Sequence, residues 1–596
     1  MSCNNKSCLF FNEGELSQLI QDVIHHKEFS ESNFIQALPL YLQKLNESEI
    51  KKDLIPFIKN WINFADRTNA CSFISMLPLF MPPHYPFDLL DDLLFPINDI
   101  IRQSSIFIES QMMEVSSIIA KYYDINRIET LILPSLDQLF IPSTIHPQGL
   151  AIRIQSYFFG LVNDSWKEKI IDRVKCLAKS KSTYVKICVL KSIPYITSKT
   201  KEDSPLFEEL INDLLIPCLS DKDFKVKTAA LASATLIGTN YFSNSQWAYK
   251  YLQMVEDPSW YVRFALAQQI KKAIIKAPDP SIFALAIIKL VKDSVTQVQS
   301  ISLNVFSECI KYFTAESLSE VPQIFEQGMN SPFEDIRSGV IDLWASLLRY
   351  HPHANFHNSM INTLNLIGVL PIESVTYHIM HKVVPLVDSK HLNKESLKKG
   401  FLFLFNAATP NWRSASIQIL RLYTKYPILR EFANEMTEYV FPFINAPSFM
   451  VRCVIGEMFL DFIKEFSWNW FLDKPIDFMR SEVNFGCSEV KISLSRTIVE
   501  LLSINPPDEI KNELLSWLNN LENDEIITVK ENAIYCHSIL DRVLAHKAKK
   551  VDDNNDIKMK NEDDKKKSKK KKNTDDDYEY YEEEEEEEEE AESRDK

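Results

Sequence analysis

Histidine is the residue type whose spacing in this sequence comes nearest to a chemical site. The stretch "YHPHANFHNS" holds His351, His353 and His357, and "HIMHK" holds His378 and His381, three residues apart and therefore on one face of a helix. Imidazole nitrogens bind zinc and related metals, but a site needs three or four ligands. No cysteine or carboxylate completes a ligand set around these histidines, so we expect no metal site there.

The other residue types that carry chemistry are scattered along the chain. Cys3 and Cys8 form a C-x4-C pair, but no second pair lies near it to complete a zinc site. The 10 glycines are too far apart to form a phosphate-binding loop or a nucleophile elbow. Carboxylates are plentiful but do not converge on one pocket. We therefore expect no catalytic residues, no cofactor and no metal, and the chain is not predicted to be an enzyme.

The composition predicts a soluble intracellular protein. Its 596 residues are 45% hydrophobic and 25% charged. The sequence contains no run of about 18 apolar residues, the length that a membrane-spanning helix needs. The 10 cysteines are dispersed and mostly flanked by apolar residues, which favours reduced thiols and a reducing compartment. The lysine run 565–572 matches a nuclear-import signal, whereas its acidic flanks argue against a nucleic-acid site. We expect a cytoplasmic location, with the nucleus as a second one, and no membrane insertion.

A recurring motif indicates the elements that must position any binding residues. In "EDPSWYVRFALAQQI", residues 256–270, Asp257 and Pro258 are typical of a helix start, and Val262 is followed directly by Arg263. Similar pairs are Val185-Lys186, Val226-Lys227, Val298-Gln299, Ile336-Arg337, Val451-Arg452, Val490-Lys491 and Val529-Lys530. The apolar members are 41, 36, 36, 38, 115, 39 and 39 residues apart. A period near 38 residues is typical of a helical solenoid.

Each period is predicted to contain one amphipathic helix, a short polar turn and a second helix that begins at the motif. The interval of 115 residues is about three periods and contains a related stretch, "ATPNWRSASIQIL". We therefore predict an all-α fold, an α-solenoid of about 14 repeats over residues 10–545. The first four repeats lack a clear motif and are assigned by length and apolar periodicity alone. Residues 1–9 and the charged segment 546–596 are predicted to be disordered.

Aspartates recur five positions before the apolar member of the motif. We predict that the apolar residue packs inside its own helix pair, while the basic residue reaches an aspartate of an adjacent repeat. The residues of this predicted inter-repeat ladder are Asp221, Lys227, Asp257, Arg263, Asp293, Arg337, Asp524 and Lys530. Because exposed ion pairs contribute only about 0–1 kcal/mol each, we expect the ladder to set the angle between repeats more than their stability.

Several of these stretches resemble, in order and spacing, the HEAT-repeat scaffold (A) subunit of type 2A Ser/Thr protein phosphatase. The resemblance is to that family's seventh, eleventh, twelfth and last repeats, in "EDPSWYVRFALAQQI", "TPNWRSASIQIL", "SFMVRCVIGEMFLDFIKEFSWNW" and "NDEIITVKENAIYCHSIL". The chain departs from the family between residues 470 and 505, where one repeat fits instead of two, at Tyr261, where the family has arginine, and in its charged tail. The resemblance implies a divergent member built of HEAT repeats.

The resemblance also implies partners. A non-catalytic scaffold of this kind holds a phosphatase catalytic subunit on its C-terminal repeats and a regulatory subunit on its N-terminal repeats. The positions expected to contact the catalytic subunit are Trp412, Arg413, Phe449, Met450, Arg452, Glu489 and Lys491. Those expected to contact the regulatory subunit are Thr183, Tyr184, Lys186, Trp260 and Tyr261. An alternative with the same architecture is a nuclear-transport or cargo adaptor.

Overall fold

Helices that follow one another in pairs make up the computed structural model. It describes residues 35, 38, 48 and 50–543, apart from 63–64, 66, 81–90, 92, 105, 142–144, 202–203, 354–356, 368, 370–371, 444–445 and 474. Within this part the chain forms helices, turns and loops, and no residue of it lies in a strand. The segments 1–9 and 546–596, which were predicted to be disordered, lie outside the described residues, together with Cys3, Cys8 and the lysine run.

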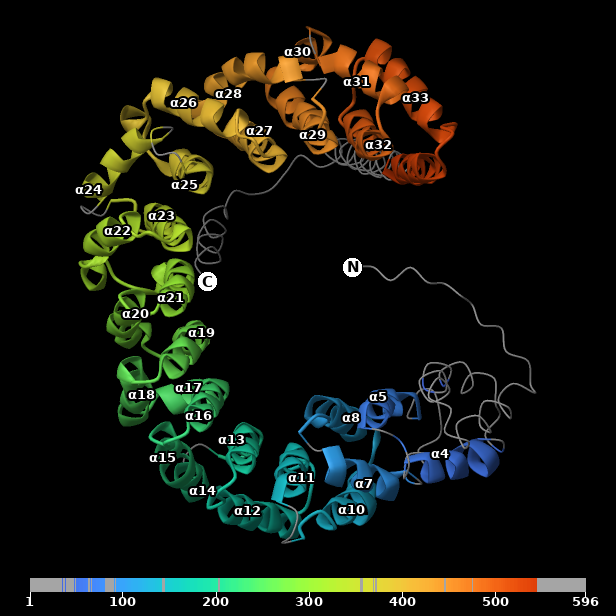
Figure 1. Ribbon diagram of the computed structural model, residues 1–596, viewed down its shortest axis with the longest axis vertical. Helices are drawn as coiled ribbons and strands as arrows, with labels where there is room; N and C mark the ends of the chain where they lie inside the picture. The colour runs from blue at the N-terminus through green and yellow to red at the C-terminus, as the bar shows by residue number, and fades with distance from the viewer. Residues whose placement is uncertain are drawn as a thin grey trace, which may run out of the picture. The chain divides into compact units, whose positions relative to one another are not determined.

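Unit 1, Met1–Ile361, is the first of two compact units (Figure 1). Its early helices are α4 (Ile55–Ile62), α5 (Arg67–Met76), α7 (Leu94–Ser104), α8 (Glu109–Tyr122), α9 (Ile125–Arg127), α10 (Leu133–Asp137) and α11 (Ile145–Tyr157). The pairs that follow are α12 (Asp164–Ala178) with α13 (Thr183–Thr197), α14 (Pro205–Glu209) and α15 (Ile216–Leu219) with α16 (Phe224–Ile237), α18 (Ser245–Leu252) with α19 (Trp260–Lys276), α20 (Ala284–Val291) with α21 (Thr296–Cys309), and α22 (Val321–Met329) with α23 (Glu334–Tyr350). The short helices α17 (Thr239–Phe242) and α24 (His357–Ile361) complete the unit.

Unit 2, Asn362–Lys596, repeats this arrangement. After α25 (Glu373–His378), its pairs are α26 (Lys394–Phe405) with α27 (Pro410–Thr424), α28 (Pro427–Val440) with α29 (Phe449–Phe466), α31 (Pro475–Phe485) with α32 (Ser488–Ser503), and α33 (Asp508–Glu522) with a helix whose described part spans 527–543. A single pair, preceded by the short α30 (Trp468–Asp473), occupies residues 470–505, as the spacing predicted.

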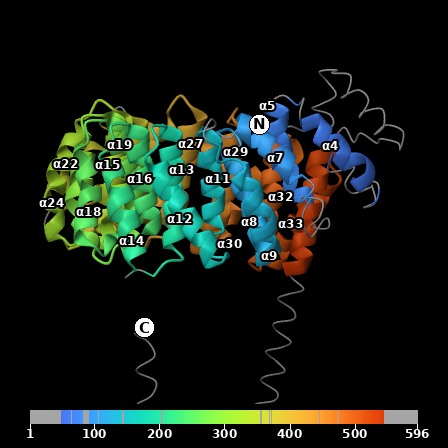
Figure 2. The ribbon, with the colours of Figure 1, turned by 90° about the horizontal axis from the view of Figure 1, so that it is seen from below.

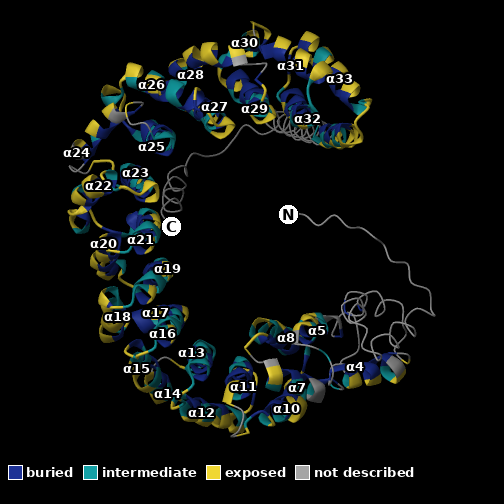
Figure 3. Cartoon of the chain, in the orientation of Figure 1, coloured by how far each residue is buried: buried dark blue, intermediate teal, exposed yellow. Residues whose placement is uncertain are grey.

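The two helices of each pair belong to two different rows. In unit 1 the second helices α13, α16, α19, α21 and α23 lie side by side in the inner row, and the first helices form the outer row (Figures 1 and 2). In unit 2, α27, α29 and α32 form the corresponding inner row (Figure 1). Residues coloured as buried gather where the rows meet, whereas residues coloured as exposed lie mostly on the outward faces (Figure 3). The predicted α-solenoid is therefore confirmed.

The motif residues explain why the pairs form at these positions. The apolar members are 0% exposed at Val185, Val226, Val262, Val298, Val451, Val490 and Val529, and 3% exposed at Ile336. Side-chain caps fix helix starts: Asn163 accepts a hydrogen bond from the Trp166 N–H (3.0 Å) at the start of α12. The predicted burial of the motif's apolar residues is confirmed.

Candidate functional site

Basic residues of the second helices form ion pairs with acidic residues of the following repeat. The pairs are Lys186–Asp221 (2.6 Å), Lys227–Asp257 (2.5 Å), Arg263–Asp293 (2.5 Å), Arg452–Glu482 (2.9 Å) and Lys491–Asp524 (2.7 Å). Glu482 was not expected, because it is a glutamate and precedes its valine by eight residues instead of five. A ladder of charge pairs thus runs between successive repeats.

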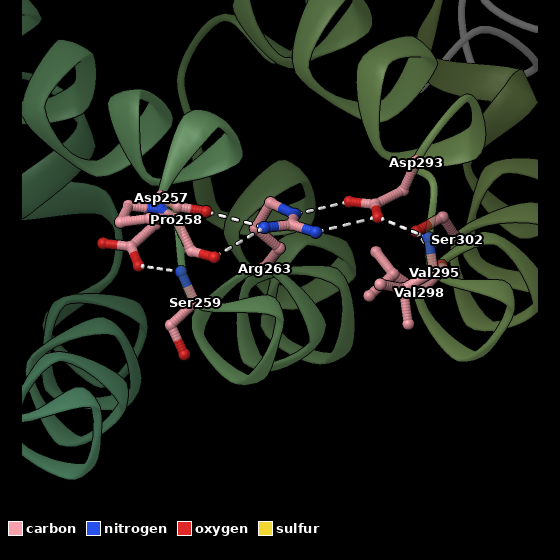
Figure 4. Close-up of polar contacts among 8 residues, drawn as sticks. All are labelled: Asp257, Pro258, Ser259, Arg263, Asp293, Val295, Val298 and Ser302. Atoms are coloured by element: carbon pink, nitrogen blue, oxygen red, sulfur yellow. Dashed lines mark hydrogen bonds and ion pairs between the residues drawn. The ribbon is translucent and has the colours of Figure 1, made fainter.

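The ladder aspartates also bind their own turns. Asp293 Oδ1 accepts a hydrogen bond from the Val295 N–H (2.8 Å), while both its oxygens accept from Arg263 (Figure 4). The same turn bond joins Asp221 to the Asp223 N–H, Asp257 to the Ser259 N–H and Asp524 to the Ile526 N–H, each at 2.9 Å. One carboxylate therefore sets the start of its own second helix and binds the preceding repeat, which explains the recurring five-residue spacing.

The ladder is more buried than we expected. The side chains of Asp257, Asp293 and Glu482 are 3%, 5% and 5% exposed; the two aspartates lie in turns, and Glu482 lies within α31. The expectation of exposed, weak ion pairs is therefore wrong at these three seams. Removing one partner of such a pair leaves a buried charge, which costs about 3–5 kcal/mol.

The partners of the ladder aspartates keep them ionised. Burial by itself would raise the pKa of Asp221, Asp293 and Asp524, but hydrogen bonds from the basic partner and from the turn N–H groups outweigh it. The pKa of each carboxyl therefore lies below its ordinary value of 3.8. Hydrogen bonding to Asp293 correspondingly raises the pKa of Arg263.

Two predicted ladder members have no acidic partner within the described residues. Arg337 Nη1 donates to the Ser331 carbonyl (2.5 Å), as Arg263 Nη1 does to the Asp257 carbonyl (2.7 Å), but no described carboxylate binds it. Lys530, in the last helix, likewise forms no ion pair with a described residue. Both residues belong to the last helix pair that the structure describes in their unit.

Three residues predicted to contact partners lie within the ladder. Arg452 donates to both oxygens of Glu482 (2.9 and 3.0 Å), and its side chain is only 18% exposed. The side chains of Lys491 and Lys186 are 12% and 26% exposed, each with its ammonium on a neighbouring aspartate. Their charged groups therefore hold adjacent repeats together, and little of them is left for another protein.

Exposed apolar side chains line the side of each unit where a first helix turns into a second helix. We call this side the turn edge. In unit 2 it carries Phe449 (44% exposed), Met450 (43%), Phe485 (86%), Ile526 (43%) and Ile527 (69%). Phe449 and Met450 were expected from the sequence, whereas the other three were missed: Ile526 and Ile527 lie three and two residues before Val529, and Phe485 lies five residues before Val490. The predicted Glu489 is exposed in the first turn of α32.

A cluster of three rings, Trp412, Tyr377 and His381, lies earlier in the sequence of unit 2. The ring of Trp412 is half-buried, with its centroid 5.9 Å from that of Tyr377, which stacks on His381 at 5.1 Å. Arg413 follows Trp412 in α27 and is also half-buried. Trp412 therefore contacts the neighbouring repeat through Tyr377 and is only partly exposed.

The turn edge of unit 1 carries a stack of three rings. Tyr261, 49% exposed, lies between Trp260 (4.0 Å between centroids) and Phe224 of the preceding repeat (4.9 Å). Phe224 was missed from the sequence, although it precedes its valine by two residues, as the predicted Trp260 does. Thr183 donates a hydrogen bond to Asp223 (2.6 Å). Tyr184 is half-buried and meets His146 edge-on at 5.5 Å, also on this edge.

Two of the histidines in the first cluster bind backbone carbonyl groups. His357 Nε2 lies 2.8 Å from the His351 carbonyl oxygen, and His351 Nε2 lies 3.3 Å from the Ile310 carbonyl oxygen. Among the described residues, no group of three or more histidines, cysteines or carboxylates could hold a metal ion. Within the same residues, no helix combines the length and apolar character needed to cross a membrane.

No family model matches the chain, and no curated protein does. Among solved structures, the fold is similar to importin beta, with a TM-score of 0.54 and 12% identity over 75% of this chain and 61% of that one. It is also similar to Kap121p bound to Pho4p, with a TM-score of 0.53 and 11% identity over 90% of this chain and 62% of that one. The chain spans about three fifths of the length of these proteins. Identities this low show the fold alone, an α-solenoid of HEAT-type repeats.

Proposed function

We propose that the chain is a non-catalytic scaffold that binds other proteins along its turn edges. The observation that carries this proposal is the set of exposed apolar side chains where first helices turn into second helices in unit 2. Phe449 and Met450 begin α29, Phe485 ends α31, and Ile527 begins the helix that follows α33. Large apolar groups exposed in a row on a soluble surface mark interaction sites. Aromatic side chains and methionine are also enriched in protein interfaces.

The ladder supports this role because its ion pairs hold in place the turns next to the exposed groups. Phe449, Met450, Ile526 and Ile527 sit one to three residues before a buried valine, and Phe485 ends the first helix α31. Aspartate–cation pairs such as Lys491–Asp524 fix the turns between such helices against the neighbouring repeat. A surface that is already held in place loses little conformational entropy when a partner binds. The repeats therefore hold the exposed apolar side chains in fixed positions, and the identity of the partner depends on which side chains lie at each turn.

We propose further that unit 2 holds a Ser/Thr phosphatase catalytic subunit and that the N-terminal repeats hold a regulatory subunit, in the cytoplasm and also in the nucleus. The resemblance of the motif stretches to the type 2A scaffold family motivates this step. For the catalytic subunit, the exposed positions Phe449, Met450 and Glu489 are the strongest candidates, with Trp412 and Arg413 beside them. For the regulatory subunit, Tyr261 and Trp260 are the most prominent.

A second candidate is a nuclear-transport or cargo adaptor. It is favoured by the structural similarity to importin beta and to Kap121p, which was solved with Pho4p bound. The lysine run 565–572 is compatible with either role.

Purification of the tagged full chain from its own cells, followed by mass spectrometry, tests the proposal. We expect a phosphatase catalytic chain to accompany the protein in stoichiometric amount and to be lost with Met450→Asp. Recovery of a small GTPase and nucleoporins in its place would support the adaptor. Hydrolytic activity of the chain after removal of all partners would contradict both.

A further inference from the structure

At one seam of unit 1 the sequence has neither charge of the ladder. The residue five positions before the motif's apolar member is an aspartate in several repeats, namely Asp221, Asp257, Asp293 and Asp524. Before Ile336, the same position is Ser331. The motif of the preceding repeat has Gln299 after its valine, where the repeats before it have lysine or arginine. The seam between α21 and α23 therefore keeps the two ladder positions with uncharged side chains.

Ser331 has the same backbone setting as the ladder aspartates. Its Oγ accepts a hydrogen bond from the Phe333 N–H (3.3 Å), two residues further on, as Asp293 accepts one from the Val295 N–H (2.8 Å). It lies in the turn between α22 and α23, and α23 lies beside α21 (Figure 1). An acidic group carried by Ser331 would therefore lie at the seam, as the ladder aspartates do.

A cation that no described carboxylate binds lies next to Ser331. Arg337 Nη1 donates to the Ser331 carbonyl (2.5 Å), and Arg337 Nε is buried with no hydrogen-bond partner among the described residues. In the repeat of α19, the hydrogen bond to Asp293 raises the pKa of Arg263, and the charge of Asp257, in the same turn as the arginine, raises it further. A negative charge at position 331 would stabilise the Arg337 guanidinium in the same way.

The sequence at this turn is one that a kinase can modify. Ser331 is followed by Pro332, and a serine or threonine directly before proline is what the proline-directed class of Ser/Thr kinases recognises. Residues 330 and 332–335 around the serine are exposed. The chain has two other pairs of this kind, Ser204-Pro205 at the start of α14 and Thr409-Pro410 at the start of α27. The serine that stands at the ladder position is therefore also a candidate for phosphorylation.

We propose that a proline-directed kinase phosphorylates Ser331 and that the phosphate takes the place of the missing ladder acid. The kinase transfers the γ-phosphoryl group of ATP. A bond forms between the γ-phosphorus and Ser331 Oγ while the bond from that phosphorus to the oxygen bridging to the β-phosphate breaks, ADP leaves, and the hydroxyl proton passes to the catalytic base of the kinase. The product carries a charge of about −1.5 to −2 and offers three strong acceptor oxygens. Glu334 and Asp335 follow in the first turn of α23, but both are exposed, so water and salt screen their repulsion.

The side chains at this seam have complementary lengths for such a contact. Between Cα and the terminal nitrogen, glutamine is one bond shorter than lysine, and between Cα and the terminal oxygens, phosphoserine is one bond longer than aspartate. Gln299 and phosphorylated Ser331 therefore span the same number of bonds as Lys227 and Asp257, which meet at 2.5 Å. The phosphate accepts a hydrogen bond from the Gln299 amide and attracts the Arg337 guanidinium. The stability of this seam then depends on a kinase.

Hydrogen exchange before and after phosphorylation tests the proposal in the folded full chain. The double variant Ser204→Ala, Thr409→Ala keeps the pair at Ser331 as its one Ser/Thr-Pro sequence, and it is treated with ATP and a purified proline-directed kinase. We expect peptide mass spectrometry to find phosphate on Ser331, and amide exchange in α21, α23 and the turn between α22 and α23 to slow about tenfold. A folded chain that takes up no phosphate at Ser331, or that takes it up without slower exchange, would overturn the proposal.

A charge variant and a matched phosphate test whether the protection comes from the ladder contact. Gln299→Lys should slow exchange further in the phosphorylated chain, because the phosphate gains the cation that other repeats provide, and should change little without phosphate. The control is Ser204, which caps α14 by accepting from the Phe207 N–H (3.2 Å). The variant Ser331→Ala, Thr409→Ala, treated with the same kinase, should show no slower exchange in α21 and α23. Protection in that control, or an equal effect of Gln299→Lys with and without phosphate, would contradict the assigned contact.

Discussion

Arg263 donates hydrogen bonds to both carboxylate oxygens of Asp293, which lies thirty residues further along the chain. Nε lies 2.5 Å from Oδ2 and Nη2 lies 3.0 Å from Oδ1, while Nη1 donates to the carbonyl of Asp257 in its own turn (Figure 4). The arginine therefore ties two successive turns together. Because its side chain is 15% exposed and that of Asp293 only 5%, the pair is shielded from solvent on both sides.

This burial predicts that the pair matters for stability. We expect Arg263→Ala to destabilise the contact between α19 and α21 by about 3–5 kcal/mol, because the Asp293 carboxylate is left buried without its cation. The double variant with Asp293→Ala should recover part of the loss. The control is Lys271→Ala, which removes an exposed pair with Glu308 between the same two helices and should cost under about 1 kcal/mol. Hydrogen exchange of α19 and α21 measures all three, and equal losses for Arg263 and Lys271 would contradict the prediction.

The ladder also predicts acid sensitivity. The pKa of Asp293 in the folded protein is below 3.8, so its ionised form is favoured by folding. The resulting stabilisation is fully present above the unfolded-state pKa and is lost as the pH falls through the folded pKa. We expect the melting temperature to fall below about pH 4. Asp293→Asn should melt lower than the parent at pH 7 and show a shallower decline below pH 4; a decline as steep as the parent's would argue against this role.

A glycine at the far end of α16 should resist substitution. Gly238 has φ +71°, and an added Cβ would lie 2.7 Å from Cδ of Lys276, whose ammonium binds the carbonyls of Thr235 (3.1 Å) and Leu236 (3.3 Å). We expect Gly238→Ala to cost about 1–2 kcal/mol through backbone strain and displacement of the lysine. If displacement of the lysine contributes, Lys276→Ala should lower the free energy of unfolding less in the Gly238→Ala protein than in the parent protein. Urea unfolding of the four proteins measures this coupling, and full additivity would leave backbone strain as the sole cause.

The turn edge of unit 2 should be sensitive to charge without loss of folding. Met450→Asp and Phe485→Asp are each expected to weaken binding of the catalytic partner by about 2 kcal/mol or more, roughly thirtyfold. Ile428→Asp is the matched control, because Ile428 is 61% exposed on α28 in the outer row. Far-ultraviolet circular dichroism should be unchanged in all three. Retained binding by the first two variants, or equal loss in the control, would exclude this edge as the contact surface.

The repeats could be predicted because their signal is local and periodic. A valine with a cation after it and an aspartate five residues before it specifies a turn, a helix start and a buried contact, and all three follow from backbone chemistry within ten residues. The sequence could not reveal how deeply Asp293 or Glu482 is buried, since that depends on neighbouring repeats. It also missed the pairing of Arg452, because Glu482 breaks the spacing at which the other acids recur.

The candidate surface was less predictable than the fold. Phe449 and Met450 were expected on the turn edge and are exposed there, but Arg452 and Lys491, drawn from the same motif, are bound inside the seams. At one helix start, some residues thus contact the adjacent repeat and their neighbours face solvent, according to the direction in which each side chain leaves the helix. A motif without its three-dimensional register does not distinguish the two, which is also why Phe485 was missed.

The separation of thirty residues between Arg263 and Asp293 also means that the ribosome synthesises the aspartate later than the arginine. At a synthesis rate of about 5–20 residues per second, the aspartate leaves the ribosome about 2–6 s after the arginine. During that interval the guanidinium already has an acceptor, the carbonyl of Asp257, only six residues behind it. Each newly made repeat can therefore hold its cation in place until the next turn emerges, so that assembly can proceed in the order of translation, one repeat behind the growing end.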